Sequence, residues 1–161
     1  MRLRSRKVAI PIHGAGPAPY DPGHVDAGAG MRIRCRAMGL IHVTVTLQGV
    51  EGADASYEAD FLVDTGATNS LAPAMELRRI GVTPAGRMAY ELADGSVHEY
   101  AFGLARIEFM GEVTAGRVLF EPDDAEPLLG VTALESVGIT VDPASRTLKR
   151  LPAIPLKSVA G

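Results

Sequence analysis

The stretch FLVDTGATNS, residues 61–70, runs from apolar residues straight into a carboxylate. Phe61, Leu62 and Val63 are typical of a buried strand, and Asp64 follows them directly. An ionised carboxylate that leaves water is costly unless a partner pairs it or its pKa changes. Gly66, two residues on, lets the backbone approach closely and offers N–H groups to a carboxylate. The stretch predicts a carboxylate held on a tight turn at a strand end, which is either functional or an ordinary surface turn.

The sequence around this stretch is typical of short β-strands joined by turns. LIHVTVTLQG (40–49) alternates apolar and polar residues with period two, and Asp94-Gly95 supplies a tight hairpin turn. We predict a mostly β domain, with a closed or nearly closed β-barrel and one clear short helix near the C-terminus. The expected strands lie within 40–49, 57–64, 87–103, 104–122, 127–130 and 139–151, with helical turns within 73–81 and between Gly130 and Gly138.

The chain divides into an unusual leader and one domain. Residues 1–38 carry seven Arg or Lys and two Asp, and residues 13–30 are mostly Gly, Ala and Pro. Such a composition cannot offset its ordering entropy. We therefore expect a disordered extension over 1–38, a domain over 39–155 and a tail over 156–161. The extension is either a basic targeting or nucleic-acid arm, or sequence upstream of an internal start.

Composition narrows the possible partners and compartment. Residues 39–161 have a net charge of −8, which argues against nucleic acid as the main ligand. No apolar run approaches the roughly 20 residues of a membrane span. Cys35 is the only cysteine, so the chain requires no oxidising compartment. We expect a cytoplasmic protein that binds neither nucleic acid nor membrane.

The order of motifs resembles that of the retropepsin-like aspartic proteases, most of all their small cellular and bacterial branch. The elements that carry the resemblance are the run Leu62-Val63-Asp64-Thr65-Gly66-Ala67, the hairpin around Asp94-Gly95, and Leu128-Leu129-Gly130 before a short helix. Together they span roughly residues 40–150. The resemblance implies a retropepsin-type barrel with a flap hairpin, and an aspartic endopeptidase that needs no cofactor or metal.

The resemblance also implies roles for individual residues. In such enzymes two Asp carboxylates share one proton and activate a water. This chain has one Asp-Thr-Gly, so the chemistry requires a homodimer with Asp64 of each subunit at a two-fold axis, acting on a peptide or protein substrate. The implied catalytic residues are Asp64, Thr65 and Gly66. The implied substrate-binding residues are Ala67, Thr68 and Asn69 of the loop and Asp94, Gly95 and Ser96 at the flap tip.

One departure from the family pattern concerns how the dimer is held together. Many retroviral enzymes have Gly-Arg-Asn/Asp where this chain has Gly130-Val131-Thr132, and the Asp that pairs with that Arg is Thr68 here. Losing both partners together avoids a stranded buried charge. We expect the segment Ile139 to Leu151 to contribute more to the dimer.

The remaining polar residues have simpler interpretations. His13, His24, His42 and His98 have no metal-ligand spacing, and His42 and His98 are expected to be surface or cross-strand residues. The acidic segment at 121–126 is expected to be a solvated loop. Two other functions stay open: a retropepsin-like dimer that binds peptides or assembles a complex without turnover, and an unrelated β-barrel binding module.

Overall fold

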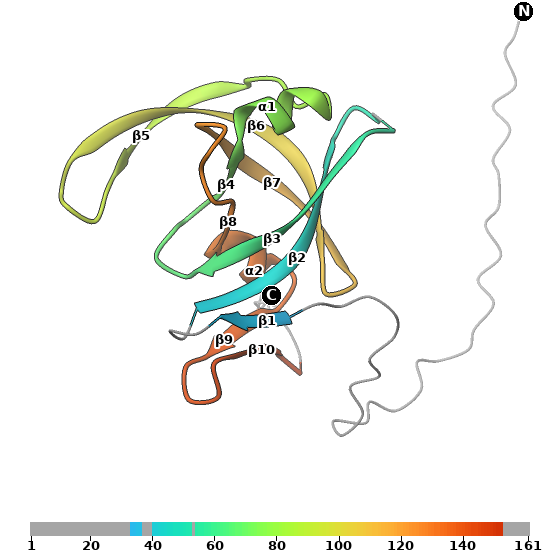
Figure 1. Ribbon diagram of the computed structural model, residues 1–161, viewed down its shortest axis with the longest axis vertical. Coiled ribbons are helices and arrows are strands. Elements are labelled where there is room, and N and C mark those ends of the chain that lie inside the picture. The colour runs from blue at the N-terminus through green and yellow to red at the C-terminus, as the bar shows by residue number, and fades with distance from the viewer. Residues whose placement is uncertain (1–32, 37–39, 53, 153–161) are drawn as a thin grey trace, which may run out of the picture.

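The computed structural model describes residues 33–36, 40–52 and 54–152, with the side chains of all but the first of these ranges. Figure 1 shows a β-barrel with a long curved hairpin projecting from one side, together with short helices. The strands are β1 (Ile33–Arg36), β2 (Leu40–Gly49), β3 (Ser56–Asp64), β4 (Ser70–Pro73), β5 (Gly86–Glu91), β6 (Val97–Phe109), β7 (Glu112–Glu121), β8 (Leu128–Gly130), β9 (Ile139–Asp142) and β10 (Thr147–Arg150). The helices are α1 (Ala74–Arg79) and α2 (Val131–Ser136).

The barrel closes because β2 pairs on both of its edges. The sheet order is β1-β2-β3-β8-β4-β7-β6-β5, and an additional antiparallel pairing joins β2 to β6 from Val45↔Phe109 to Gly49↔Ala105. Six strands therefore form a ring, which removes the exposed edges that an open sheet would leave. The predicted mostly β barrel with a short helix near the C-terminus is confirmed.

The interior of the ring is filled by the apolar positions of the alternating strands. Val43, Val45 and Leu47 of β2 are buried against Phe61 of β3 and Phe109 of β6, each no more than 2% exposed. The polar residues between them bond across the outer face, as where the Thr44 hydroxyl donates to Asp60 at 2.9 Å. The period-two pattern of LIHVTVTLQG thus places one face in the core.

Strand β6 is longer than the sequence suggested. It runs without a break through Gly103, joining the outer hairpin, expected over 87–103, to the barrel strand expected from 104. A Cβ on Gly103 would lie 2.4 Å from Cγ1 of Val82 and 2.8 Å from the Thr83 carbonyl oxygen. This glycine therefore does not end a strand; it lets β6 pass close to the segment before β5.

The sheet begins earlier than the expected domain boundary at residue 39. β1 lies inside the segment assigned to a disordered extension, yet it pairs antiparallel with β2 from Ile33↔Val43 to Arg36↔Leu40. β1 pairs with residues at the beginning of β2 that take no part in the pairing between β2 and β6. The expectations for residues 1–32 and for the C-terminal tail at 156–161 lie outside the described residues.

Helix α1 starts with help from a distant acidic loop. The Asp123 carboxylate accepts a hydrogen bond from the Met75 backbone N–H at 2.7 Å, where Pro73 gives no side-chain cap. Carboxylates are favourable at this end of a helix because the first N–H groups lack intrahelical partners. The sequence predicted only a solvated loop at 121–126. The structure shows that part of this acidic loop also caps α1.

The last hairpin, β9–β10, forms a separate two-stranded sheet beside α2. Its turn is organised by Asp142, which accepts hydrogen bonds from the Ala144 N–H at 2.9 Å and the Ser145 hydroxyl at 2.8 Å. Asp142 also pairs with the Lys149 ammonium across the hairpin. The expected turn at Asp142-Pro143 is confirmed, and these donors, Lys149 first, hold the pKa of the Asp142 carboxyl well below its usual range.

We predict that Asp142 stabilises the hairpin in a pH-dependent way. A lowered folded-state pKa favours the ionised carboxylate, so its contribution is present above the unfolded value of about 4 and is lost as the pH falls through the folded value. Asp142→Asn should lower the melting temperature at pH 7, and the difference from wild type should shrink toward about pH 2. Thermal unfolding monitored across this range measures it. The control Asp124→Asn removes an exposed carboxylate from the acidic loop and should show no such trend; an equal trend in both variants would contradict the assignment.

Candidate active site

Asp64 lies where two parallel strands end together. β3 and β8 pair in parallel with the register Leu62↔Leu128, Val63↔Leu129 and Asp64↔Gly130. Asp64 is thus the last residue of β3, and it is paired with Gly130, the glycine at the start of α2. Strand ends at one sheet edge are where functional side chains of different segments are brought together.

The turn after Asp64 holds the carboxylate in one orientation. The Gly66 N–H donates to Asp64 Oδ1 at 2.8 Å, and the Ala67 N–H donates to the Asp64 carbonyl oxygen at 3.3 Å. Asp64 is half-buried in the single chain, whereas Thr65 and Gly66 are exposed. The predicted turn geometry at Asp-Thr-Gly is therefore present, with an exposed rim able to meet another surface.

The loop between β3 and β4 is attached to the start of α2 by backbone hydrogen bonds. The Val131 N–H donates to the Ala67 carbonyl at 2.8 Å, and the Thr132 N–H donates to the Thr68 carbonyl at 3.2 Å. Val131 and Thr68 are the positions at which the retroviral Arg–Asp pair was expected to be missing, and each takes part in one of these neutral backbone bonds, though not with the other. The first N–H groups of a helix need external acceptors, and the loop supplies them.

Ser70 is a site-supporting residue that sequence reasoning did not single out. Its side chain is 2% exposed, and its hydroxyl accepts a hydrogen bond from the Gly130 N–H at 3.1 Å. A Cβ on Gly130 would lie only 2.5 Å from the carbonyl carbon and oxygen of Asn69. The sequence showed both residues, but only their contact across 60 positions reveals why a serine and a glycine are needed.

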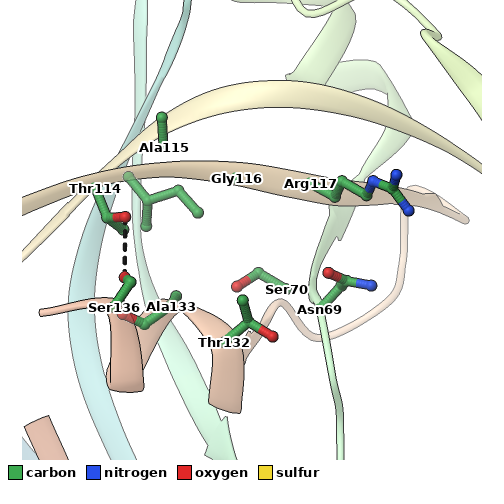
Figure 2. A pocket seen from close by; sticks show the side chains of 10 residues that line it. Asn69, Ser70, Thr114, Ala115, Gly116, Arg117, Thr132, Ala133 and Ser136 are labelled. Atoms are coloured by element: carbon green, nitrogen blue, oxygen red, sulfur yellow. Dashed lines mark hydrogen bonds between the residues drawn. The ribbon is translucent and has the colours of Figure 1, made fainter. Parts of the chain in front are cut away.

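A small hollow lies between this loop, α2 and β7. It has a volume of about 40 Å³ and is lined in part by Asn69, Ser70 and Thr132, which Figure 2 shows grouped opposite β7. Ser136 of α2 donates to the Thr114 hydroxyl of β7 at 2.9 Å at its other end. The volume suits ordered water rather than a substrate side chain.

A larger hollow opens beside the Asp-Thr-Gly turn. It measures about 340 Å³ and is lined by Thr65, the residues Val131, Leu134 and Glu135 of α2, Gly138, the β9 residues Ile139, Thr140 and Val141, and Leu151. Its lining is mainly apolar and includes part of the segment expected to support a dimer. The hollow therefore adjoins both the catalytic turn and the terminal hairpin.

The expected flap is the hairpin of β5 and β6. At its tip, Gly95 has a φ of +81°, and the Ser96 N–H and hydroxyl both donate to Asp94 Oδ1, at 2.9 and 2.6 Å. These bonds lower the pKa of the exposed Asp94 carboxyl, the Ser96 hydroxyl most of all. Among the described residues, no hydrogen bond joins the predicted tip residues Asp94, Gly95 and Ser96 to the catalytic loop.

The hydrogen bond between hairpin and loop comes from a different pair. The Asn69 side-chain amide donates to the Tyr90 hydroxyl of β5 at 2.8 Å. Asn69 was predicted to bind substrate, whereas Tyr90 was not singled out. No sequence signal marks Tyr90, because its partner lies on another element.

His42 was expected to be a surface or cross-strand residue, and of these two the surface position is wrong. It is 7% exposed, its Nε2 lies 2.9 Å from Oε1 of Glu126, and its Nδ1 is buried with no hydrogen-bond partner in the described part of the chain. Glu126 precedes β8, so the pair joins β2 to the segment that leads into the site.

No three His, Cys, Asp or Glu side chains among the described residues are grouped so as to hold a metal ion. No described helix is long and apolar enough to span a membrane.

We predict that Gly130 is required for the site to form. Gly130→Ala places a Cβ against the Asn69 backbone, which cannot move aside as a flexible side chain could, and should destabilise the fold by about 1–3 kcal/mol. The matched control is Gly116→Ala in β7, where the nearest atom to a new Cβ is Ile107 Cδ1 at 3.9 Å. Urea unfolding compares the two, and equal stabilities would show that the close approach does not matter.

A family model and a solved structure show what this chain is similar to. Residues 50–136 match the family model described as gag-polyprotein putative aspartyl protease, a span that includes the Asp-Thr-Gly turn, the β5–β6 hairpin and α2. No curated protein gives a significant match. Among solved structures, the solution structure of a simian foamy virus protease is 18% identical, with 58% of this chain and 90% of that chain covered and a TM-score of 0.42. Since the family model covers more than half of the sequence, the chain belongs to the family of gag-polyprotein putative aspartyl proteases.

Proposed function

We propose that the protein is a homodimeric aspartic endopeptidase that hydrolyses peptide bonds with Asp64 of two subunits. The observation that carries the proposal is the single Asp-Thr-Gly turn, in which the Gly66 N–H holds one carboxylate oxygen at 2.8 Å and the loop is attached to α2. This is a preorganised acid–base group with an exposed rim, in a chain of an aspartyl protease family.

The need for two subunits follows from the chemistry. One carboxylate cannot both take a proton from water and give one to the scissile carbonyl in the same step. Two Asp64 side chains facing each other would share one proton, because like charges so close cannot both ionise easily. The sequence contains no second Asp-Thr-Gly, so the partner carboxylate comes from a second copy related by a two-fold axis.

The proposed reaction uses the shared proton in both directions. The ionised carboxylate takes a proton from the bound water as the water oxygen attacks the peptide carbonyl carbon, and the protonated carboxyl gives its proton to the carbonyl oxygen. The resulting tetrahedral diol collapses when the protonated carboxyl gives its proton to the amide nitrogen, the C–N bond breaks, and the ionised carboxylate takes the proton of one diol hydroxyl. The dyad then has one proton again, and an acid and an amine are released.

The substrate is proposed to be an extended peptide or protein segment lying between the catalytic loop and the hairpin. Thr68 and Asn69 follow the catalytic turn and would line the walls of the site. The tip residues Asp94, Gly95 and Ser96 would cover the peptide, and their mutual hydrogen bonds make the tip a compact turn. A lid of this kind excludes water and positions the bound chain.

The proposed dimer surface contains the catalytic turn and the larger hollow. Thr65 is exposed in the single chain, and the hollow beside it is lined by α2, β9 and Leu151. Ile139 to Leu151 is the segment proposed to stabilise the dimer in place of an Arg–Asp pair. The neutral positions Thr68 and Val131 also support placement in the small cellular and bacterial branch.

A cytoplasmic location is also part of the proposal. It rests on Cys35, because a chain with one cysteine needs no oxidising compartment. Fractionation of cells that express the chain tests this location.

The competing function is a dimeric peptide-binding or assembly module without turnover, and the intact Asp-Thr-Gly turn favours the peptidase.

We predict that activity depends on two copies of Asp64. Asp64→Asn is nearly isosteric and should abolish cleavage of a peptide library while the fold persists, since Asn cannot share the proton. When wild type and Asp64→Asn are mixed in equal amounts and exchange subunits, about one quarter of the dimers should be wild-type pairs. Activity per total protein should fall to roughly that quarter and vary as the square of the wild-type fraction.

The controls for this experiment separate the shared site from a general loss of function. Native mass spectrometry of tagged chains must first show subunit exchange. Asp124→Asn, the same change in the exposed acidic loop, should leave activity unaltered in the same mixture. A linear dependence after proven exchange would mean that each chain has its own complete site. No cleavage by wild type, together with peptide binding, would favour the assembly module.

A further inference from the structure

The β5–β6 hairpin has little attachment to the rest of the protein. β5 is the last strand in the sheet order and pairs only with β6 among the described strands. Figure 1 shows the hairpin curving out beyond the barrel on the side to which the loop after β3 also projects. Its position relative to the catalytic loop must therefore come from a few side-chain contacts.

Within the described part of the chain, two side-chain hydrogen bonds join β5 to elements other than β6. The Tyr90 hydroxyl accepts the 2.8 Å hydrogen bond from Asn69, and the Met88 sulfur lies 3.6 Å from Nη1 of Arg117 on β7. The sulfur is a weak acceptor, and the two side chains of this contact, those of Met88 and Arg117, are both exposed. The second contact therefore contributes little to the position of the hairpin. The bond between Tyr90 and Asn69 is the stronger link between hairpin and loop.

Both partners of this bond are already oriented. The Tyr90 ring packs edge-on against Tyr100 of β6, with ring centroids 6.1 Å apart and an interplanar angle of 71°. On the other side, the Asn69 backbone is held by the close approach of Gly130 and by the bonds of the neighbouring residue Thr68 to α2. A hydrogen bond between two preoriented groups loses little entropy when it forms.

We propose that Tyr90 is a positioning residue, which sets the height of the hairpin above the catalytic turn through its hydrogen bond with Asn69. Asn69 lies five residues after Asp64 on the same loop, so the bond couples the hairpin to the segment that carries the carboxylate. The consequence for catalysis rests on the proposed function. The coupling itself is a property of the folded chain and can be measured without any activity.

Hydrogen exchange of the backbone amides of residues 86–97 tests the coupling. Tyr90→Phe keeps the ring and removes the hydroxyl, and should speed exchange in the hairpin about three- to tenfold, the change expected from losing one neutral hydrogen bond. Asn69→Ala should speed the same amides to a similar extent. Because both variants remove one interaction, the double variant should be no faster than either single variant.

A matched control and a rescue separate this bond from general loosening. Tyr100→Phe removes a hydroxyl from the same hairpin that has no hydrogen-bond partner among the described residues, and should leave exchange unchanged. Asn69→Asp should retain protection, because a tyrosine hydroxyl can donate to a carboxylate as well as accept from an amide. Unchanged exchange in Tyr90→Phe, or additive effects in the double variant, would overturn the proposal.

Peptide cleavage provides a second measurement where activity is present. Tyr90→Phe and Asn69→Ala should each lower kcat/KM by about the same factor, and the double variant should lose no more than one of them. Additive losses would overturn the positioning role. If wild type cleaves no peptide while the exchange pattern holds, the peptidase proposal fails and the coupling between hairpin and loop stands.

Discussion

The site depends on the close approach of Gly130 to the backbone of Asn69. With no Cβ at Gly130, α2 can start directly against the loop that follows β3, and its first N–H groups reach the carbonyls of Ala67 and Thr68. The Ser70 hydroxyl satisfies the Gly130 N–H in the buried space between them. The loop, the helix start and the end of β3 thus form one rigid unit, which carries Asp64.

Because backbone hydrogen bonds hold the loop to the start of α2, no charged pair is needed there. Backbone hydrogen bonds between neutral groups need no desolvation of ions, so they can be buried at lower cost than an Arg–carboxylate pair. They place no ion pair at the start of α2, and the larger hollow beside it has a mainly apolar lining that includes one carboxylate residue, Glu135. In the proposed dimer, contacts between copies would then rest on shape and apolar burial at α2 and the β9–β10 hairpin.

Several local features could be predicted from the sequence because their causes are local. The alternation in 40–49 predicted β2, the turn residues Asp94-Gly95 and Asp142-Pro143 predicted two hairpins, and the Asp-Thr-Gly run predicted the tight turn that holds Asp64. Residues whose surroundings come from distant segments were misjudged or missed. His42 is buried by its place on β2 and bonds to Glu126, 84 positions away, and Asp123 caps a helix 48 positions before it.

The sequence by itself determined the strand pattern, the mostly β class and the single Asp-Thr-Gly carboxylate, since side-chain periodicity and turn chemistry depend on neighbours along the chain. Only the tertiary structure decided that β2 closes the barrel by pairing with β6, that β6 continues through Gly103, and that β1 extends the sheet. It alone brought Tyr90 to Asn69 and Gly130 to the catalytic loop. The physical reason is that these contacts join backbone and side-chain groups of segments far apart in sequence, and no local preference of either segment specifies its partner.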